Sequence, residues 1–242
     1  MTEGERIQKV LARAGVGSRR AVEAMIEAGR IRVNGQRARL GGRVDPAKDE
    51  VLLDGSPVPL AAGLVHYLLN KPAGVVSTAA DPQGRPTVVD LVDSDRRLWP
   101  VGRLDVATEG AIIVTNDGEL AQRLTHPSYE VSKTYLAEVA GEVSHEALRT
   151  LRTGVELDDG VTAPARVDLV DKGGGRSLLE LELTEGRNRQ VRRMCEAVGY
   201  PATRLVRTAI GPLSLGRLKP GVWRRLAPLE IQSLYRAVKG DE

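Results

Sequence analysis

A segment rich in proline, alanine and glycine, Ser56–Gly63, divides the 242-residue chain into a short N-terminal part and a long remainder. Residues 1–48 hold eleven Lys/Arg and five Asp/Glu, whereas the rest holds twenty-four and twenty-seven. This asymmetry predicts a basic module, residues 1–60, joined to a near-neutral body, residues 64–240. Basic modules of this size most often bind phosphate backbones, although an ordinary solvated surface explains the charge alone about equally well.

Composition limits the classes of protein to which the chain can belong. Hydrophobic residues make up 41%, enough for a packed core, and no run approaches the roughly 20 apolar residues that span a bilayer. The polar, acidic start does not resemble a signal peptide, and the single cysteine, Cys195, cannot form an internal disulfide, so we expect a cytoplasmic protein without membrane association. Neither metal-ligand spacing nor a glycine-rich phosphate loop occurs, so we expect no metal and no cofactor.

Periodicity and turn residues predict two helices and a hairpin in the basic module. Apolar residues recur at helical spacing over 7–14, and Ser18 is placed to cap a second helix. Arg30–Arg37 alternates like a strand and contains the Asn-Gly pair typical of a hairpin turn. Arg19 and Arg20 would stand in the first turn of the second helix, where the helix dipole disfavours them and a bound phosphate would explain them.

This segment resembles the small alpha-L RNA-binding domain named after ribosomal protein S-four. The matching stretches are Arg6–Ala12, Gly17–Ala21 and Gly29–Gly35, and the likeness covers about residues 3–60. It implies binding of structured RNA, read mainly by shape and backbone. The residues expected to contact RNA are Arg6, Lys9, Arg19, Arg20, Arg30 and Arg37. Because this domain accompanies unrelated activities, it indicates a partner and not a reaction.

Beyond the linker, strand and helix patterns mix without the alternation of a parallel βαβ sheet. The apolar runs 64–70 and 111–115 predict buried strands. Gly173–Gly175 joins two alternating stretches, 165–171 and 177–183, as a hairpin loop. We therefore expect the α+β class.

One aspartate stands in a polar loop between two apolar segments. The loop, Gly102–Gly110, places Arg103 two residues before Asp105. A carboxylate beside a guanidinium stays ionised, and an ionised carboxylate can act as a nucleophile. On the loop alone, a structural Asx-turn aspartate is the simpler interpretation. The other motifs of the chain favour the nucleophile.

Two further segments could complete a site with Asp105. Lys133 and Tyr135 share one face of a predicted strand with Val131, and a tyrosine beside a lysine can stack on a nucleobase, although a core role fits as well. Four arginines crowd the start of a predicted helix whose apolar face contains Cys195, which favours an anion site over simple surface solvation. These are Arg187, Arg189, Arg192 and Arg193.

Five motifs, in order, resemble the bacterial ribosomal RNA pseudouridine synthase family. They are Leu69–Gly74, Gly102–Asp105, Asn116–Gly118, Lys133–Tyr135 and Glu185–Met194, and the likeness continues to Leu213. Within the family the chain is most similar to large-subunit pseudouridine synthase B, because of the long basic segment before Met194 and the arginine-rich N-terminal part. The resemblance implies a mixed, largely antiparallel sheet with flanking helices and a site in a cleft across it.

The resemblance also implies roles for individual residues. Asp105 would be the nucleophile, Tyr135 would pack on the target base, and Arg192, or else Arg187, would pair with the aspartate. Arg103 would fix or open the target nucleotide. The remaining RNA contacts expected in this part of the chain are Lys71, Lys133, Arg187 and Arg189. The implied partner is ribosomal RNA, as a stem-loop or an assembling particle, bound by a monomer.

The implied reaction is isomerisation of a specific uridine to pseudouridine in large-subunit ribosomal RNA. Small-subunit ribosomal RNA is the nearest alternative substrate, and a non-catalytic RNA-binding protein of ribosome assembly is the alternative class. A methyltransferase would need a glycine-rich cofactor loop, and a metal nuclease would need clustered carboxylates; the sequence shows neither motif.

Overall fold

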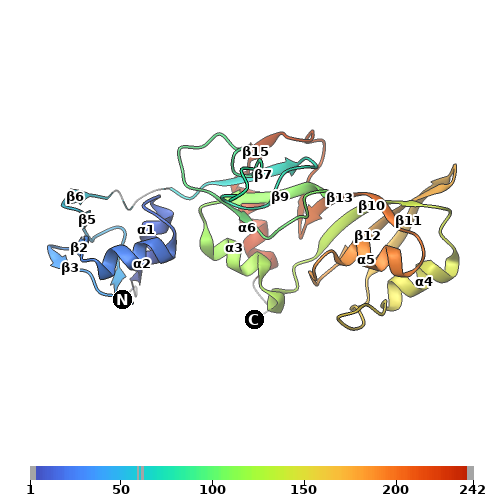
Figure 1. Cartoon of the computed structure of the whole chain (residues 1–242), viewed down its shortest axis with the longest axis horizontal. Coiled ribbons are helices and arrows are strands. Elements are labelled where there is room, and N and C mark those ends of the chain that lie inside the picture. The colour runs from blue at the N-terminus through green and yellow to red at the C-terminus, as the bar shows by residue number, and fades with distance from the viewer. Residues whose placement is uncertain (1–3, 59, 61–62, 239–242) are drawn as a thin grey trace. The chain divides into compact units, whose positions relative to one another are not determined.

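A computed structural model describes residues 4–58, 60 and 63–238. The chain forms two compact units, which Figure 1 shows in colours that follow the sequence. Of the described residues, the first unit contains those up to Val65 together with Asp93–Leu98 and Thr115–Gly118, and the second contains the others. None of the helices in the described part of the chain is long and apolar enough to cross a membrane.

The N-terminal unit combines two helices with two small antiparallel sheets. The helices pack around a core that includes Val10, Leu11, Val22 and Ile31. The sheets have the orders β1-β4 and β3-β2-β5-β6. In chain order the elements are β1 (Glu5–Arg6), α1 (Ile7–Arg13), α2 (Arg19–Glu27), β2 (Ile31–Val33), β3 (Gln36–Arg37), β4 (Arg43–Val44), β5 (Val51–Leu53) and β6 (Ser56–Pro57).

Local signals predicted this unit well. Ser18 caps α2, since its Oγ accepts a hydrogen bond from the backbone N–H of Ala21 at 3.1 Å. Asn34 and Gly35 close the β2–β3 hairpin with φ values of 48° and 79°, the left-handed conformation that an Asn-Gly turn favours. Both the expected cap and the expected hairpin are therefore confirmed.

The first two residues of the predicted linker belong to a strand. Ser56–Pro57 forms β6 and pairs with β5, because proline is tolerated on an edge strand where no neighbour needs its missing N–H. Pro59, Ala61 and Ala62 of that linker lie outside the described residues. The boundaries 1–60 and 64–240 stay a prediction.

The second unit is built on a nine-stranded sheet with the central order β11-β12-β10-β13-β9-β7-β15, to which β8 and β14 add. Strands β9 and β13 run parallel, whereas the pairs β10–β12, β10–β13, β11–β12 and β7–β15 are antiparallel. The expected α+β class with a mixed, largely antiparallel sheet is thus confirmed. Its strands are β7 (His66–Lys71), β8 (Trp99–Val101), β9 (Glu109–Thr115), β10 (Lys133–Ala140), β11 (Arg166–Gly173), β12 (Arg176–Leu183), β13 (Ala202–Ile210), β14 (Leu213–Ser214) and β15 (Trp223–Arg225).

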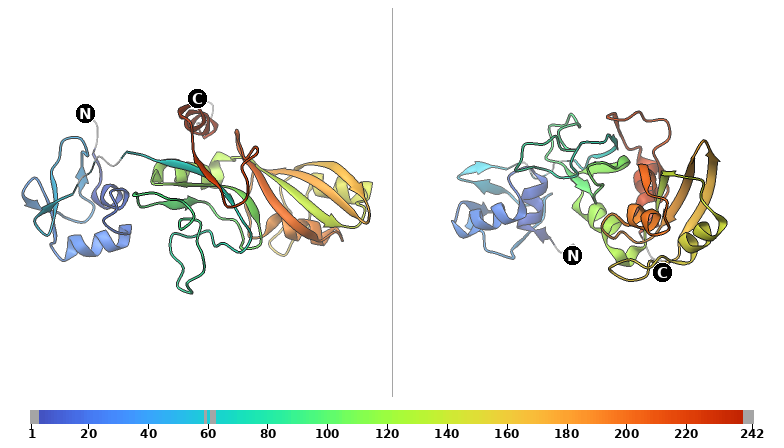
Figure 2. Two further views of the ribbon diagram at one scale, coloured as in Figure 1. Left: turned by 90° about the horizontal axis from the view of Figure 1, so that it is seen from above. Right: turned by 45° about the vertical axis from the view of Figure 1, so that its right-hand side comes forward.

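Helices flank this sheet and bury two cores. They are α3 (Gly118–Thr125), a 3-10 turn (Pro127–Tyr129), α4 (His145–Thr153), α5 (Gln190–Ala197) and α6 (Pro228–Ala237). One core joins α4 and α5 to β10–β12, and the other joins α3 and α6 to β7 and β9. Figure 2 shows α6 beside the twisted sheet. Cys195 is fully buried in the first core, as its helical spacing predicts, and burial raises the pKa of its thiol to about 12.

Candidate active site

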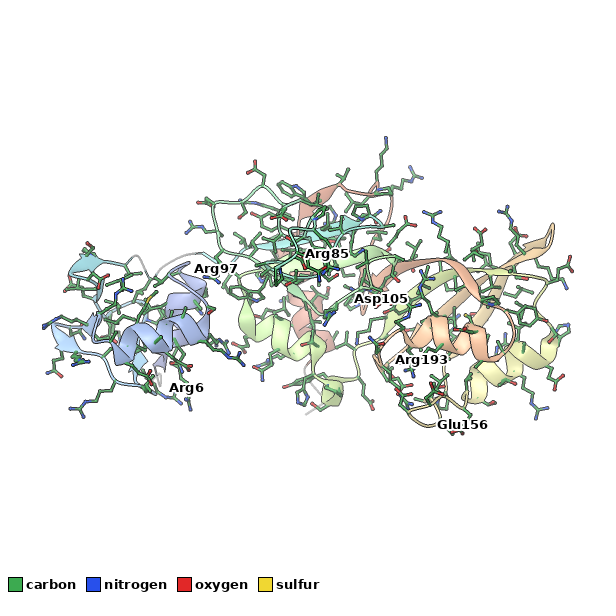
Figure 3. The ribbon with its side chains drawn as sticks, in the orientation of Figure 1. Arg6, Arg85, Arg97, Asp105, Glu156 and Arg193 are labelled. Atoms are coloured by element: carbon green, nitrogen blue, oxygen red, sulfur yellow. The ribbon has the colours of Figure 1, made fainter. Side chains whose placement is uncertain are left out.

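A cavity of about 380 Å³ opens in the second unit beside Asp105. Its walls come from the loop Gly102–Asp105, from three strands and from the segment Glu185–Val191 at the start of α5. The strands contribute Tyr135 from β10, Leu183 from β12 and Leu205 from β13. Figure 3 labels Asp105 near the sheet and Arg193 on α5. Residues from three of the singled-out sequence segments therefore meet around one cavity.

Hydrogen bonds fix the backbone of the Asp105 loop both just before and just after the aspartate. The hydroxyl of Ser77, a buried residue, donates to the carbonyl of Leu104 at 2.9 Å and accepts from its N–H at 3.1 Å. The N–H of Thr108 donates to the Asp105 carbonyl at 3.0 Å, which closes a turn. The carboxylate, 32% exposed, thus projects from a fixed backbone.

Lys71, the last residue of β7, holds the other side of the loop. Its side chain is fully buried, and its ammonium donates to the carbonyls of Pro72, Val106 and Thr108 at 3.0, 3.2 and 2.8 Å. Burial lowers the pKa of Lys71 to about 8, against the opposing influence of the Glu109 and Asp105 carboxylates. The expected RNA contact of Lys71 is therefore wrong, because the ammonium points into the protein beneath the loop.

The strand after the loop lies unusually close to β13. Gly110 has a φ of 109°, and a Cβ built there would stand 2.2 Å from the Arg207 carbonyl oxygen. On the same strand, Glu109 accepts hydrogen bonds from Arg204 at 2.8 and 3.0 Å, and this guanidinium holds the pKa of Glu109 below its usual value. Glycine and an ion pair thus join the end of the Asp105 loop to the central sheet.

Two arginines of the basic segment contact the Asp105 loop. Arg189, in the left-handed conformation just before α5, places Nη1 3.9 Å from Asp105 Oδ2. Arg192 donates instead to the carbonyls of Ala107 at 3.2 Å and Ala202 at 3.0 Å, and its buried Nε has no hydrogen-bond partner. The expected Arg192–Asp105 pair is not formed in this structure, because the guanidinium is held by backbone carbonyls on either side.

Arg187 and Arg193 are engaged within the protein. Arg193 makes two hydrogen bonds of 2.9 Å to the Asp159 carboxylate, whose pKa this guanidinium lowers. Arg187 donates to Glu185 at 3.2 Å and to the carbonyls of Gly160 and Val161 at 2.8 and 2.7 Å. Arg187 therefore lines the cavity but does not form the alternative pair with Asp105 that its position in the sequence allows.

The remaining predicted residues of this unit differ in exposure. Arg103 is exposed at the cavity wall, and Tyr135 is half-buried in it. Lys133 is two residues away on β10, outside the cavity wall; burial lowers its pKa, and the nearby Arg207 charge lowers it further. The strand begins at Lys133, so Val131 precedes it.

The basic residues of the N-terminal unit fall into two groups. Arg6, Arg19 and Arg20 are exposed, the last two in the first turn of α2. The others already have partners inside the unit: Lys9 pairs with Glu5 at 3.1 Å, Arg30 donates to Asp54 at 3.0 Å, and Arg37 donates to the Glu27 carbonyl at 2.9 Å. Within the described residues, Arg19 and Arg20 are the clearest candidates for phosphate contacts.

Comparison with known proteins places these features in one family. A model of the RNA pseudouridylate synthase family matches residues 65–197, and an S4 domain model matches residues 5–51. The chain belongs to the RNA pseudouridine synthase family. This synthase is therefore an isomerase that carries an S4-type RNA-binding domain.

Individual relatives cover almost the whole synthase. An uncharacterized RNA pseudouridine synthase of Mycobacterium tuberculosis is 51% identical over 97% of this chain and 94% of its own length. Ribosomal large subunit pseudouridine synthase B of Bacillus subtilis is 43% identical over 95% of each chain. A solved structure described as a pseudouridylate synthase matches with a TM-score of 0.68 and 29% identity, over 95% of this chain and 99% of that chain.

Sequence reasoning did not single out Ser77 and assigned Lys71 to RNA, so it missed how both side chains support the Asp105 loop. Ser77 carried no signal, since a serine in a loop is ordinary. Lys71 did carry a signal, because it directly follows a buried apolar run. A lysine in such a place must either reach the surface where the strand ends or donate to acceptors inside the protein. Asp159 pairs with arginines more than twenty-five positions away, which no local pattern indicates. Among the described residues, no group of His, Cys, Asp and Glu is arranged to hold a metal ion.

Proposed function

We propose that this synthase converts a specific uridine of large-subunit ribosomal RNA to pseudouridine in the cytoplasm, with Asp105 as the nucleophile. The observation that carries the proposal is the partly exposed Asp105 carboxylate at a cavity, on a loop held by Ser77 and Lys71. A fixed carboxylate needs little reorganisation when a reacting atom arrives. The name of the B. subtilis relative supports large-subunit RNA as the substrate.

The reaction exchanges one bond of the base for another. The bond from sugar carbon 1′ to uracil N1 breaks and a bond from carbon 1′ to C5 forms, while C5 loses its proton and N1 gains one. Atoms and electrons balance without an oxidant or an energy source. Asp105 can add to carbon 1′, add to C6 of the uracil, or remove a proton from the sugar; all three routes use the same ionised carboxylate.

The cavity walls supply groups for the other steps. The target base must leave its stack to reach Asp105, which costs a few kcal/mol. Tyr135 offers an aromatic face that offsets this cost by stacking. Arg103, at the exposed wall, is placed to hold the extruded nucleotide by its phosphate. Arg189, whose Nη1 lies 3.9 Å from Asp105 Oδ2, keeps positive charge near the carboxylate, and Arg192 binds the Ala107 carbonyl of the same loop.

Release of the C5 hydrogen tests the proposal. Uridine labelled with tritium at C5 is incorporated into transcripts of large-subunit and small-subunit ribosomal RNA, and each is offered free and as a protein-bound particle. Wild-type protein is compared with Asp105→Ala and Asp105→Asn. We expect release from the large-subunit RNA by wild type only, with RNA binding retained by both variants.

Each other outcome has a distinct meaning. Undiminished release by the Asp105 variants would refute the nucleophile. Release from the small-subunit RNA alone would keep the mechanism and change the substrate. No release from any RNA or particle would leave an RNA-binding protein of ribosome assembly as the function.

A further inference from the structure

The C-terminal third of the synthase contains a long stretch without acidic residues. Residues 197–229 include no Asp or Glu but hold six Lys/Arg. These are Arg204, Arg207, Arg217, Lys219, Arg224 and Arg225. Concentrated charge of one sign repels itself and opposes the compact state unless a partner neutralises it. The partners of the six cations therefore show whether the protein itself accounts for them.

Three of the six are used inside the protein. Arg204 pairs with Glu109 at 2.8 Å, and Arg224 pairs with Glu230 at 2.6 Å. Arg207 is buried and donates to the Ala111 carbonyl at 2.8 Å. These cations have structural roles, and they leave Arg217, Lys219 and Arg225 to be explained.

The remaining three cations are exposed on one segment, Gly216–Arg225, which contains the turn Lys219–Val222 and strand β15. We call this segment the basic hairpin for brevity, although its strand pairs with β7 and not with β14. No ion pair joins Arg217, Lys219 or Arg225 to an acidic side chain among the described residues. The guanidinium of Arg225 lies 5.7 Å from the centre of the Tyr67 ring, so its contact is with an aromatic face. Val222, 46% exposed, and the half-buried Trp223 add apolar surface beside these charges.

The backbone of the basic hairpin is held firmly against β7. Asn70 donates from its N–H to the Val222 carbonyl at 3.0 Å and accepts from the Gly221 N–H at 2.8 Å. Its side-chain amide also donates to the Leu218 carbonyl at 2.7 Å. The charged side chains thus stand on a rigid support, which lowers the entropic cost of binding a partner.

Two consecutive residues connect the basic hairpin to the active-site loop. Asn70 binds the hairpin, and Lys71 binds the carbonyls of Val106 and Thr108. Asn70 and Lys71 are consecutive residues at the end of β7, so the hairpin and the Asp105 loop are both hydrogen-bonded to the same end of this strand.

We propose that the basic hairpin is a second RNA-binding surface of this unit, where Arg217, Lys219 and Arg225 bind the phosphates of nucleotides flanking the target uridine. Lys and Arg contacts to phosphate are independent of sequence and position the nucleic acid. The proposal rests on the proposed function for the substrate, but not on turnover. The hairpin therefore sets affinity and register, while Asp105 performs the chemistry.

Binding without turnover tests the surface. In the Asp105→Ala background, the triple variant Arg217→Gln/Lys219→Gln/Arg225→Gln is titrated with large-subunit ribosomal RNA transcript over a range of KCl concentrations. We expect its affinity at low salt to fall at least about tenfold. Loss of three phosphate contacts lowers the slope of log affinity against log salt by about 2 to 3.

A matched control separates this surface from charge in general. Arg149→Gln/Lys172→Gln/Arg176→Gln removes the same formal charge from exposed positions on α4, β11 and β12, where Lys172 and Arg176 form ion pairs with Glu142 at 3.8 Å and Glu138 at 3.6 Å. An equal loss in the control, or an unchanged slope in the hairpin variant, would overturn the proposal. Thermal unfolding checks that both variants are folded. If wild type binds through the hairpin but releases no tritium from any RNA, the proposed reaction fails while the surface stands.

Discussion

At the scale of single residues, the Asp105 loop depends on a lysine whose ammonium is bound inside the protein. Lys71 is fully buried and saturates three carbonyls, two of them within three residues of Asp105. Methionine has a similar length but no donor, so Lys71→Met would leave those carbonyls unsatisfied. We expect a loss of about 2–4 kcal/mol in the free energy of unfolding. Urea denaturation measures it, and the exposed Lys172→Met serves as the control.

The same lysine predicts a pH dependence. Its pKa of about 8 in the folded protein lies below the usual 10.5, so between these values the unfolded chain binds more protons at this site. The contribution of Lys71 to the free energy of unfolding therefore rises with pH over this window, by up to about 3 kcal/mol. Wild type should gain stability relative to Lys71→Met between pH 7 and 10. A difference that stays constant with pH would contradict the assignment.

Arg189 and Arg192 offer different kinds of support to Asp105. The Arg189 contact of 3.9 Å is made by a side chain 52% exposed, and exposed ion pairs contribute little. Arg192 is held by the Ala107 and Ala202 carbonyls and so ties α5 to the backbone of the Asp105 loop and to β13. We expect Arg192→Gln to lower kcat about 100-fold, with partial recovery in Arg192→Lys. Arg189→Gln should mainly raise KM. Tritium release under steady-state conditions measures both, and equal kcat values in the Gln variants would refute the distinction.

At the scale of elements, the parallel contact between β9 and β13 depends on one glycine. An alanine Cβ at Gly110 would overlap the Arg207 carbonyl in a conformation that side chains rarely adopt. We expect Gly110→Ala to cost more than about 3 kcal/mol of unfolding free energy and to abolish activity by displacing the Asp105 loop. Gly174→Ala is the control, since it has a positive φ of 61° but open space around it. Its cost should be near 1 kcal/mol.

Elements determined by neighbouring residues could be predicted from the sequence. The Ser18 cap and the Asn34–Gly35 turn depend on hydrogen bonds and φ angles within four residues. The Gly173–Gly175 loop between β11 and β12 and the buried face of α5 follow from periodicity in the same way. Such features are local, and the chain's own alternation of polar and apolar residues specifies them.

Contacts between distant segments could not be predicted in this way. Lys71 meets Val106 and Thr108 across more than thirty positions, and Arg193 meets Asp159 across thirty-four. A charged residue near a motif looks the same in sequence whether it faces RNA or a buried carbonyl. The motif residues that line the cavity could therefore be identified from the sequence. The fold was needed to show which arginines are already bound within the protein and which remain available to a substrate.

At the scale of the whole molecule, the proposed function assigns RNA binding and chemistry to different residues, so we expect that the two can be varied separately. Arg19 and Arg20 are exposed in the first turn of α2, where the helix dipole opposes their charge. We expect Arg19→Ala/Arg20→Ala to weaken RNA binding and to lower the slope of log affinity against log salt by about 1 to 2. Titrations of ribosomal RNA transcript at several KCl concentrations measure the change, with Lys9→Ala/Arg30→Ala, whose charges are already paired, as the comparison.

The turnover of the same variant distinguishes a binding role from a catalytic one. Neither arginine lines the cavity at Asp105. We therefore expect their contacts with RNA to be equally strong in the bound substrate and in the transition state, so that losing them weakens binding only. KM should rise with the dissociation constant, while kcat at saturating RNA stays within about twofold. A large fall in kcat would instead mean that the N-terminal unit helps to present the uridine to Asp105. The salt slope and kcat together therefore decide whether this S4 domain only captures RNA or also takes part in the catalytic step.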